Sequence, residues 1–294
     1  MNIQWYPGHM TKAKRAMKED IKLIDLVIEL VDARVPFSSR NPDIDELGAG
    51  KARMVLLNKA DLADAEQTGR WCAWFEAQNM EAVKVDARNK GTLKNIQAAV
   101  QRACREKIER DRRRGILNRP IRAMVVGIPN VGKSTFINSF AGKACAKTGN
   151  KPGVTKGNQW IRLNKSLELL DTPGILWPRF EDQQVGLRLA MIGSINDEIL
   201  NRDELALEVI RFLQEKYPAP LRERYGLGEE MGPEAVLEQA AKSRGCLLKG
   251  GLLDLSKAAK LILDDFRAGR LGRVTLESPP EKETEQEGEA HENP

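Results

Sequence analysis

The stretch Gly127-Ile128-Pro129-Asn130-Val131-Gly132-Lys133-Ser134 matches the phosphate-binding pattern G-x4-G-K-[ST]. An apolar run from Ala123 to Val126 precedes it, and a stretch with helical character continues to Phe140. A strand, a glycine-rich turn and a helix in this order present successive backbone N–H groups to an anion at the helix N-terminus. The stretch therefore predicts an α/β nucleotide-binding fold. The expected phosphate ligands are Asn130, Val131, Gly132, Lys133, Ser134 and Thr135.

Individual residues of this loop have separate expected roles. Gly127 permits a tight turn, and Gly132 lets the backbone approach a phosphate closely, because neither has a side chain. Lys133 is expected to reach the β- and γ-phosphates, and the Ser134 hydroxyl is expected to ligate Mg²⁺. The loop thus predicts a nucleoside triphosphate bound together with magnesium.

The sequence Asn58-Lys59-Ala60-Asp61 matches the N-K-x-D pattern and directly follows the apolar run Met54 to Leu57. An ionised Asp61 only accepts hydrogen bonds, and it can take two of them from the ring N–H and exocyclic amine of guanine. Adenine offers an acceptor where guanine has one of these donors. The motif therefore predicts that Asn58, Lys59 and Asp61 read guanine.

The sequence Asp86-Ala87-Arg88 follows another apolar run and stands where GTPases usually have Ser-Ala-Lys. Asp86 departs from that pattern, so the contribution expected from this segment is the backbone N–H at Ala87, facing the guanine carbonyl. Asp86 itself is assigned to the nucleotide site without a defined side-chain role.

The sequence Asp171-Thr172-Pro173-Gly174 fits D-x-x-G and follows the apolar run Leu167 to Leu170. Asp171 is expected to hold Mg²⁺ through water, and the Gly174 N–H to sense the γ-phosphate. Thr155 resembles the switch threonine that ligates Mg²⁺ in the GTP state, and Asn130 resembles the asparagine that holds K⁺ in related GTPases. The expected ligands are GTP or GDP, Mg²⁺ and, as a candidate, K⁺.

The order of these motifs is rotated, because the phosphate loop of an ordinary GTPase precedes N-K-x-D. Apolar runs alternate with helical stretches, which predicts a mostly parallel sheet with helices on both faces and the motifs at its carboxyl edge. The stretches Gln159–Leu163 and Leu167–Leu170 favour a hairpin at Asn164-Lys165. We expect a circularly permuted P-loop GTPase domain over residues 1–178.

Helical patterns dominate the residues that follow, at Glu204–Lys216, Pro233–Ser243 and Ser256–Phe266. They predict a C-terminal α-helical domain over residues 179–276, covalently coupled to the nucleotide-sensing switch. From Glu277 to Pro294 there are seven Glu and one Lys with almost nothing apolar, which predicts a disordered acidic tail.

The distribution of charge along the chain bears on which classes of partner are expected. The net charge is +5 despite the acidic tail, so the rest of the chain is basic, which suits an anionic partner such as nucleic acid and equally well an excess of Lys and Arg that solvates helices. Arg102 to Arg122 holds nine basic and three acidic residues, which suits either a solvated linker or an RNA-phosphate contact.

No apolar run approaches a membrane span, and the scattered Cys72, Cys104, Cys145 and Cys246 show no C-x-x-C pairing. We expect a cytoplasmic protein with reduced thiols and no membrane partner.

Three further segments support a family resemblance: WYPGHM at 5–10, DARVP at 32–36 followed by RNP at 40–42, and DFRAGRLGR at 265–273. Together with the rotated motif order they resemble the YlqF/RbgA family of ribosome biogenesis GTPases, over nearly all of residues 1–276. The resemblance implies a GTPase that binds a late precursor of the large ribosomal subunit and its rRNA, and leaves after hydrolysis. It also implies that the helical domain binds RNA, with no DNA partner.

The catalytic group is expected to be His9. Ile175 stands where many GTPases place the glutamine that orients the attacking water, and an apolar side chain cannot do this. The chain has two histidines, of which His291 lies in the acidic tail. An imidazole exchanges protons with water near neutral pH, although a surface or RNA-contacting histidine is the competing interpretation of His9.

Other function classes remain for comparison. Basic charge does not identify the RNA, so an RNA-binding GTPase that regulates translation or acts on tRNA is the main alternative. A GTP-dependent RNA-binding module without enzymatic activity is another. Guanine specificity and D-T-P-G disfavour a P-loop kinase, and the lack of a lipidation motif disfavours a membrane signalling GTPase.

Overall fold

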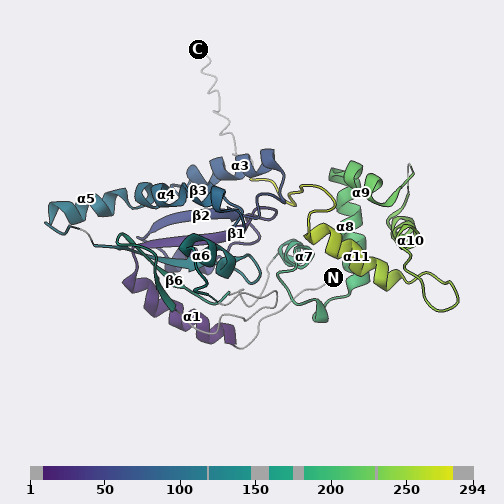
Figure 1. The fold of residues 1–294 in the computed structure, drawn as a ribbon, viewed down its shortest axis with the longest axis horizontal. Helices are drawn as coiled ribbons and strands as arrows, with labels where there is room; N and C mark the ends of the chain where they lie inside the picture. The colour runs from purple at the N-terminus through teal and green to yellow at the C-terminus, as the bar shows by residue number, and fades with distance from the viewer. Residues whose placement is uncertain (1–8, 118, 147–158, 175–181, 229–230, 281–294) are drawn as a thin grey trace, which may run out of the picture.

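The computed structural model describes residues 9–117, 119–146, 159–174, 182–228 and 231–280, with side chains described from Arg15 onward. Figure 1 shows two adjoining parts: a sheet with helices on both faces, and a group of helices beside it. The predicted fold class is confirmed. Within the described residues no helix has the length and hydrophobicity needed to cross a membrane.

The sheet has six strands in the order β3-β2-β1-β4-β6-β5. All neighbours are parallel except β5 and β6, which form the predicted hairpin. Every residue of the central strand β1 is buried, including Glu29 and Asp32, and the other five are apolar, as is typical of a parallel strand covered on both faces. The bounds are β1 Leu26–Asp32, β2 Ala52–Asn58, β3 Glu81–Lys84, β4 Ile121–Val126, β5 Gln159–Arg162 and β6 Leu167–Asp171.

Successive side chains of the strands point to opposite faces of the sheet, where they join two clusters. Val55 and Leu57 of β2 pack with Trp71 of the helix α3 in one cluster, whereas Leu56 belongs to the other and larger cluster. The helices of the sheet part are α1 His9–Asp20, α2 Asp43–Leu47, α3 Ala65–Glu76, α4 Ile96–Ala103, α5 Arg105–Arg113 and α6 Lys133–Ala141.

The stretch from Leu93 to Arg114 does not form one continuous helix. A short 3₁₀ segment ends at Leu93, and α4 and α5 are separated at Cys104, where φ is −99° and ψ is 13°. Cys104 is buried, whereas no residue of α5 is buried. The core therefore holds α4, whereas α5 contacts it mainly through Ile108 and exposes its four arginines to water.

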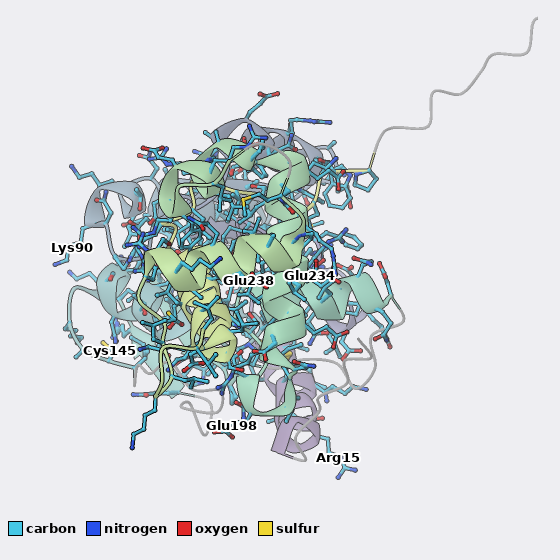
Figure 2. The ribbon with its side chains drawn as sticks, turned by 90° about the vertical axis from the view of Figure 1, so that its right-hand side faces the viewer. Arg15, Lys90, Cys145, Glu198, Glu234 and Glu238 are labelled. Atoms are coloured by element: carbon cyan, nitrogen blue, oxygen red, sulfur yellow. The ribbon has the colours of Figure 1, made fainter. Side chains whose placement is uncertain are left out.

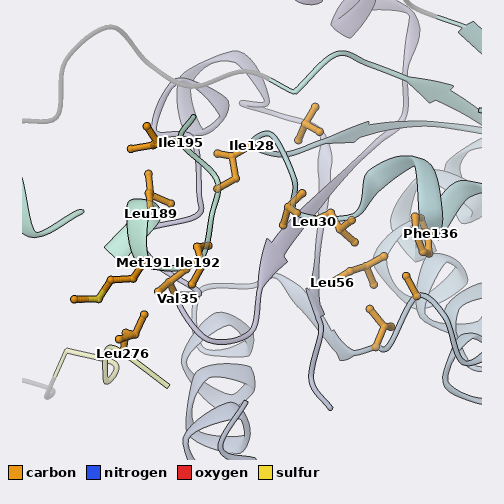
Figure 3. Packing of buried hydrophobic residues seen from close by; sticks show 14 of the residues in the cluster. Leu30, Val35, Leu56, Ile128, Phe136, Leu189, Met191, Ile192, Ile195 and Leu276 are labelled. Carbon is orange, nitrogen blue, oxygen red and sulfur yellow. The ribbon is translucent and has the colours of Figure 1, made fainter. Parts of the chain in front are cut away.

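The second part consists of α7 Gln183–Met191, α8 Arg202–Lys216, α9 Pro218–Tyr225, α10 Pro233–Ser243 and α11 Leu255–Arg267. Its core is continuous with that of the sheet part. Ile128, Leu189, Ile192 and Leu276 lie in one buried cluster, which Figure 3 shows crossing the junction. The two parts thus share an apolar interface.

After α11 the chain returns to the sheet part as a strap, defined here as residues 268–277. The N–H of Val274 donates to the carbonyl of Leu62 (3.0 Å), and the N–H of Leu276 donates to the carbonyl of Arg34 (2.7 Å). These bonds bring the end of the chain's helical region onto the segment that follows N-K-x-D.

Glu277 was predicted to begin the disordered tail, but it makes defined contacts in the structure. Its carboxylate accepts hydrogen bonds from the N–H and hydroxyl of Ser38 and pairs with Arg188 (3.3 Å), while its carbonyl accepts from Trp71 Nε1 (3.0 Å). Burial raises the pKa of this carboxyl group, and the donors around it oppose the rise. The ordered chain therefore extends past Glu277, and residues 281–294 lie outside the described part.

The four cysteines are unpaired thiols, as predicted. Burial raises the pKa of Cys72 to about 11 and that of Cys104 to about 12, so both are protonated at neutral pH.

Candidate nucleotide-binding site

The phosphate loop leaves β4 and enters α6 with the backbone that its glycines were predicted to supply. Gly132 has φ +100°, and a Cβ placed there would lie 2.5 Å from Asn58 Nδ2. The amine of Lys133 turns back across the loop and donates to the carbonyls of Gly127 (2.8 Å) and Ile128 (3.0 Å). The loop is therefore closed around a buried lysine, with the N–H groups of residues 130–135 at the start of α6.

Asn58 joins three loops that are separate in sequence. Its Nδ2 donates to the carbonyl of Val131 (2.8 Å) in the phosphate loop, and its Oδ1 accepts from the N–H of Ala87 (3.0 Å). Its neighbour Lys59 donates from Nζ to the carbonyl of Asn130 (2.9 Å). The first two residues of N-K-x-D thus hold the phosphate loop in place beside the base-reading segment.

The contact at Ala87 differs from the prediction that its N–H faces the guanine carbonyl. The Asn58 amide lies within hydrogen-bond distance and takes this donor. Asp86 acquires a defined role instead, because its Oδ1 accepts from the N–H (2.9 Å) and Nε (3.3 Å) of Arg88 and so shapes its own turn.

Asp61 has a carboxylate oxygen available for a base. Oδ2 accepts from Arg88 Nη2 (2.6 Å), whereas Oδ1 is buried and has no hydrogen-bond partner among the residues that the structure describes. A buried acceptor without a donor is costly, and guanine brings two donors. Asp61 therefore fits the base-reading role.

Asp171 has a similar feature at the phosphate end of the site. It ends β6, is almost fully buried, and its Oδ1 has no partner within the described part of the chain. Burial raises its pKa to about 6, against the opposing effect of Lys133, while burial lowers the pKa of Lys133 to about 8. A bound divalent cation would favour the ionised carboxylate, so the residue fits a Mg²⁺ site.

The D-x-x-G turn approaches the phosphate loop closely at Gly174, which accounts for a glycine at this position. A Cβ at this position would lie 2.9 Å from the Cα and N of Pro129 and 3.0 Å from Lys133 Nζ. Only glycine lets the D-x-x-G turn lie this close to the phosphate loop.

Ser134 is the second residue of α6. Thr155 and Ile175 lie outside the described residues, and His9 begins α1 with its side chain outside them.

A buried ion pair next to the site was not assigned from the sequence. Asp32, at the end of β1, accepts from Arg34 Nε (2.9 Å) and Nη2 (2.8 Å) and pairs with Lys59 Nζ (2.9 Å). Burial raises the pKa of Asp32, but Arg34 and Lys59 more than reverse this and hold the pKa well below its usual value. Asp32 and Arg34, at and just after the end of the mostly apolar strand β1, were the available signal for such a pair.

A family model described as "50S ribosome-binding GTPase" matches residues 122–223, which begin at β4, after the base-reading segments. "Ribosome biogenesis GTPase A" of Bacillus cereus is 52% identical over 284 residues, covering 96% of this chain and 95% of that protein. The protein of the same name from Thermotoga maritima is 33% identical over 277 residues, covering 94% and 95%.

A solved structure agrees with these relatives. GNP-bound YlqF from T. maritima superposes with a TM-score of 0.65 at 28% identity, covering 92% of this chain and 99% of that one. With the phosphate loop, the guanine-reading segment and D-x-x-G meeting at one sheet edge, the chain belongs to the ribosome biogenesis GTPase A family and is a GTPase that acts in ribosome assembly.

Proposed function

We propose that this GTPase binds a late precursor of the large ribosomal subunit in the GTP state and is released after hydrolysis. The observation that carries the proposal is the identity of 47–52% to relatives named "Ribosome biogenesis GTPase A", over 95–96% of the chain. The particle, in this proposal, stimulates hydrolysis and so makes release depend on its own state of assembly. The protein then works in the cytoplasm.

In the bound state Asp61 accepts two hydrogen bonds from guanine, and residues 130–135 with Lys133 hold the phosphates. Ser134 and Thr155 ligate Mg²⁺, Asp171 holds it through water, and the Gly174 N–H senses the γ-phosphate. Asn130 is the K⁺ ligand. When bound, the two cations supply positive charge beside the phosphate oxygens. If Asn130 has this role, hydrolysis is faster in K⁺ than in Na⁺; equal rates contradict it.

The attacking water is positioned by His9 in this proposal. The residue lies at the N-terminal end of α1, and no other histidine lies among the described residues. Imidazole both accepts and donates a proton near neutral pH, which suits a water that loses a proton as it attacks.

Residues 179–276 form the proposed RNA-binding domain. Figure 2 looks onto this part and shows Glu234 and Glu238 on α10, which makes that face unsuited to a phosphate backbone. Exposed basic side chains lie instead at the end of α10 and on α11: Lys242, Arg244, Lys257 and Lys260. Together with the exposed basic helix α5 they are the proposed rRNA contacts.

Sedimentation of native lysate with a non-hydrolysable GTP analogue tests the proposal. We expect the protein to cofractionate with large-subunit precursors, and Asp61→Asn to remove it from them. A free pool, or a pool bound only to small RNA, contradicts subunit assembly and favours the alternative role in translation or on tRNA.

A further inference from the structure

A side-chain amide connects the phosphate loop to the helical part. Asn130 has a left-handed backbone, with φ +59°, and its Nδ2 donates to the carbonyl of Gly193 (2.9 Å) just after α7. The carbonyl of Asn130 accepts from Lys59 Nζ (2.9 Å). One loop residue is therefore held from two sides, by the guanine-reading segment and by the helical part.

Arg267, the last residue of α11, fixes the position of Gly193. Its Nε donates to the carbonyl of Met191 (3.0 Å) and its Nη2 to that of Ala190 (2.8 Å), so it satisfies two carbonyls at the end of α7. Asp197 pairs with the same guanidinium at 2.7 and 2.8 Å. Gly193 has φ +78°, and a Cβ on it would lie 3.1 Å from Arg267 Nε. The fork of Arg267 and the Gly193 turn thus form one tight unit.

A second path runs from Arg267 to the same loop residue. Its backbone carbonyl accepts from Arg34 Nη1 (3.3 Å). Arg34 pairs with Asp32, and Asp32 holds Lys59, which reaches the carbonyl of Asn130. Both paths leave Arg267 and end at Asn130, one at the side-chain amide and the other at the backbone carbonyl.

Apolar side chains connect the end of α7 with the phosphate loop across the junction of the two parts. Leu189, Met191 and Ile192 are buried in the cluster that also contains Ile128 of the phosphate loop, as Figure 3 shows. Packed side chains leave little free space, so a shift of the end of α7 also displaces the phosphate loop.

We infer that Arg267 is a positioning residue for nucleotide binding: through Gly193 and Asn130, the helical part sets the geometry of the phosphate loop. The inference rests on the proposed role of residues 130–135 in holding phosphate. Its consequence is that displacement of the helical part by a bound particle changes nucleotide affinity without any contact between that particle and the nucleotide.

A double-mutant cycle on GDP affinity, measured by calorimetry with Mg²⁺ present, tests the inference. Asn130→Gly removes the amide while keeping a residue that accepts the left-handed backbone. Arg267→Lys keeps the charge for Asp197 but cannot span both carbonyls. Each single change should weaken binding by about two- to tenfold, the effect of one hydrogen bond, and the double variant should be no weaker than the weaker single one.

Two further variants make the result decisive. Asp197→Asn loosens the Arg267 fork without changing Arg267, and it should show the same coupling to Asn130→Gly if Arg267→Lys does not fold. Arg224→Ala is the matched control, because it breaks another arginine–carboxylate pair of the helical part, between Arg224 on α9 and Asp265 on α11 (2.7 Å). It should leave GDP affinity unchanged.

Losses that multiply in the double variant, or wild-type affinity in both folded Arg267→Lys and folded Asp197→Asn, would overturn the inference. Lys133→Ala separates this failure from failure of the site itself. If Lys133→Ala still binds GDP as the wild type does, the phosphate-site assignment is wrong. If it loses GDP while the cycle is additive, only the coupling is wrong.

Discussion

At the scale of single residues, Asp61 has the environment that most directly identifies its ligand, since one carboxylate oxygen is paired with Arg88 and the other is buried without a partner among the described residues. We expect Asp61→Asn to weaken GDP binding by roughly ten- to a hundredfold, because the amide presents donors to a base edge that donates. Calorimetric titration with GDP and ADP measures both affinity and base preference.

Arg88→Gln is the control for that change, because it removes the ion pair with Asp61 but keeps the carboxylate. It should retain the preference for guanine over adenine. Unchanged GDP affinity in a correctly folded Asp61→Asn protein would contradict the assignment of the base-reading residue.

A second prediction at this scale concerns His9. His9→Ala should leave GTP binding and particle binding near normal, whereas particle-stimulated hydrolysis falls by roughly ten- to a thousandfold, the usual effect of losing a positioning or acid–base group. Phosphate release with and without ribosomal particles is the measurement. Full stimulated turnover in the variant would mean that another group orients the water.

The sequence patterns predicted which segments come together at the nucleotide site. They did not predict hydrogen bonds that depend on the tertiary structure. Asn58 and Asp171 end β2 and β6, and Lys133 begins the helix after β4, so their place at one edge of the sheet could be inferred. The N–H of Ala87 was assigned to guanine, but it donates to Asn58, and nothing in the spacing of the two segments indicates this bond.

At the scale of the elements, β1 ends in a charge cluster that aligns the neighbouring N-K-x-D segment. Asp32 is fully buried and pairs with Arg34 and Lys59. Asp32→Asn leaves the buried Arg34 and the partly exposed Lys59 without a counterion, so we expect a loss of about 3–5 kcal/mol in the free energy of unfolding. Urea denaturation followed by circular dichroism measures it.

The matched change at a more exposed ion pair is Glu81→Gln. Glu81 pairs with Arg102, whose side chain is 59% exposed, so this substitution should cost less than about 1 kcal/mol. Equal losses in the two variants would show that burial of the Asp32 pair has no special importance for stability.

Elements with strong apolar periodicity were predicted closely, and short or polar ones were not. The apolar runs of β2, β4 and β6, and the long helix α8, lie where expected. The helix α9 has only eight residues, and α1 has three lysines and an arginine among its twelve, so few apolar side chains mark either helix in the sequence. The break between α4 and α5 arises because the core ends at Cys104, which is a property of the tertiary structure.

At the scale of the whole molecule, the strap makes the two parts depend on each other. It joins residues far apart in sequence, such as Leu276 and Arg34, through backbone hydrogen bonds. Local patterns contain no information about such pairs, and for this reason Glu277 was assigned to the acidic tail. The strap ends beside the segment that follows the guanine-reading residues, so the helical part is fastened to both ends of the nucleotide site.

The basic helix α5 lies at the opposite end of the long axis from α9, α10 and α11, as Figure 1 shows. None of its residues is fully buried, and only Ile108 packs against the core, so its arginines are not needed for the core. If α5 and the helical part both bind rRNA, the molecule spans two sites on the particle. A change confined to α5 should then weaken particle binding and leave nucleotide binding intact.

The variant with Arg112, Arg113 and Arg114 replaced by Ala tests this arrangement. We expect weaker binding to large-subunit precursors and a flatter salt dependence, by about 0.7–0.9 log units of slope for each rRNA phosphate that the variant no longer neutralises. Sedimentation binding assays over a range of KCl concentrations give the slope, and GDP titration should give the wild-type affinity. Replacing the same residues with Lys keeps the charges, so that variant should retain most of the wild-type slope. A wild-type slope in the Ala variant would mean that α5 is only a solvated link between α4 and β4, and that the helical part alone binds the particle.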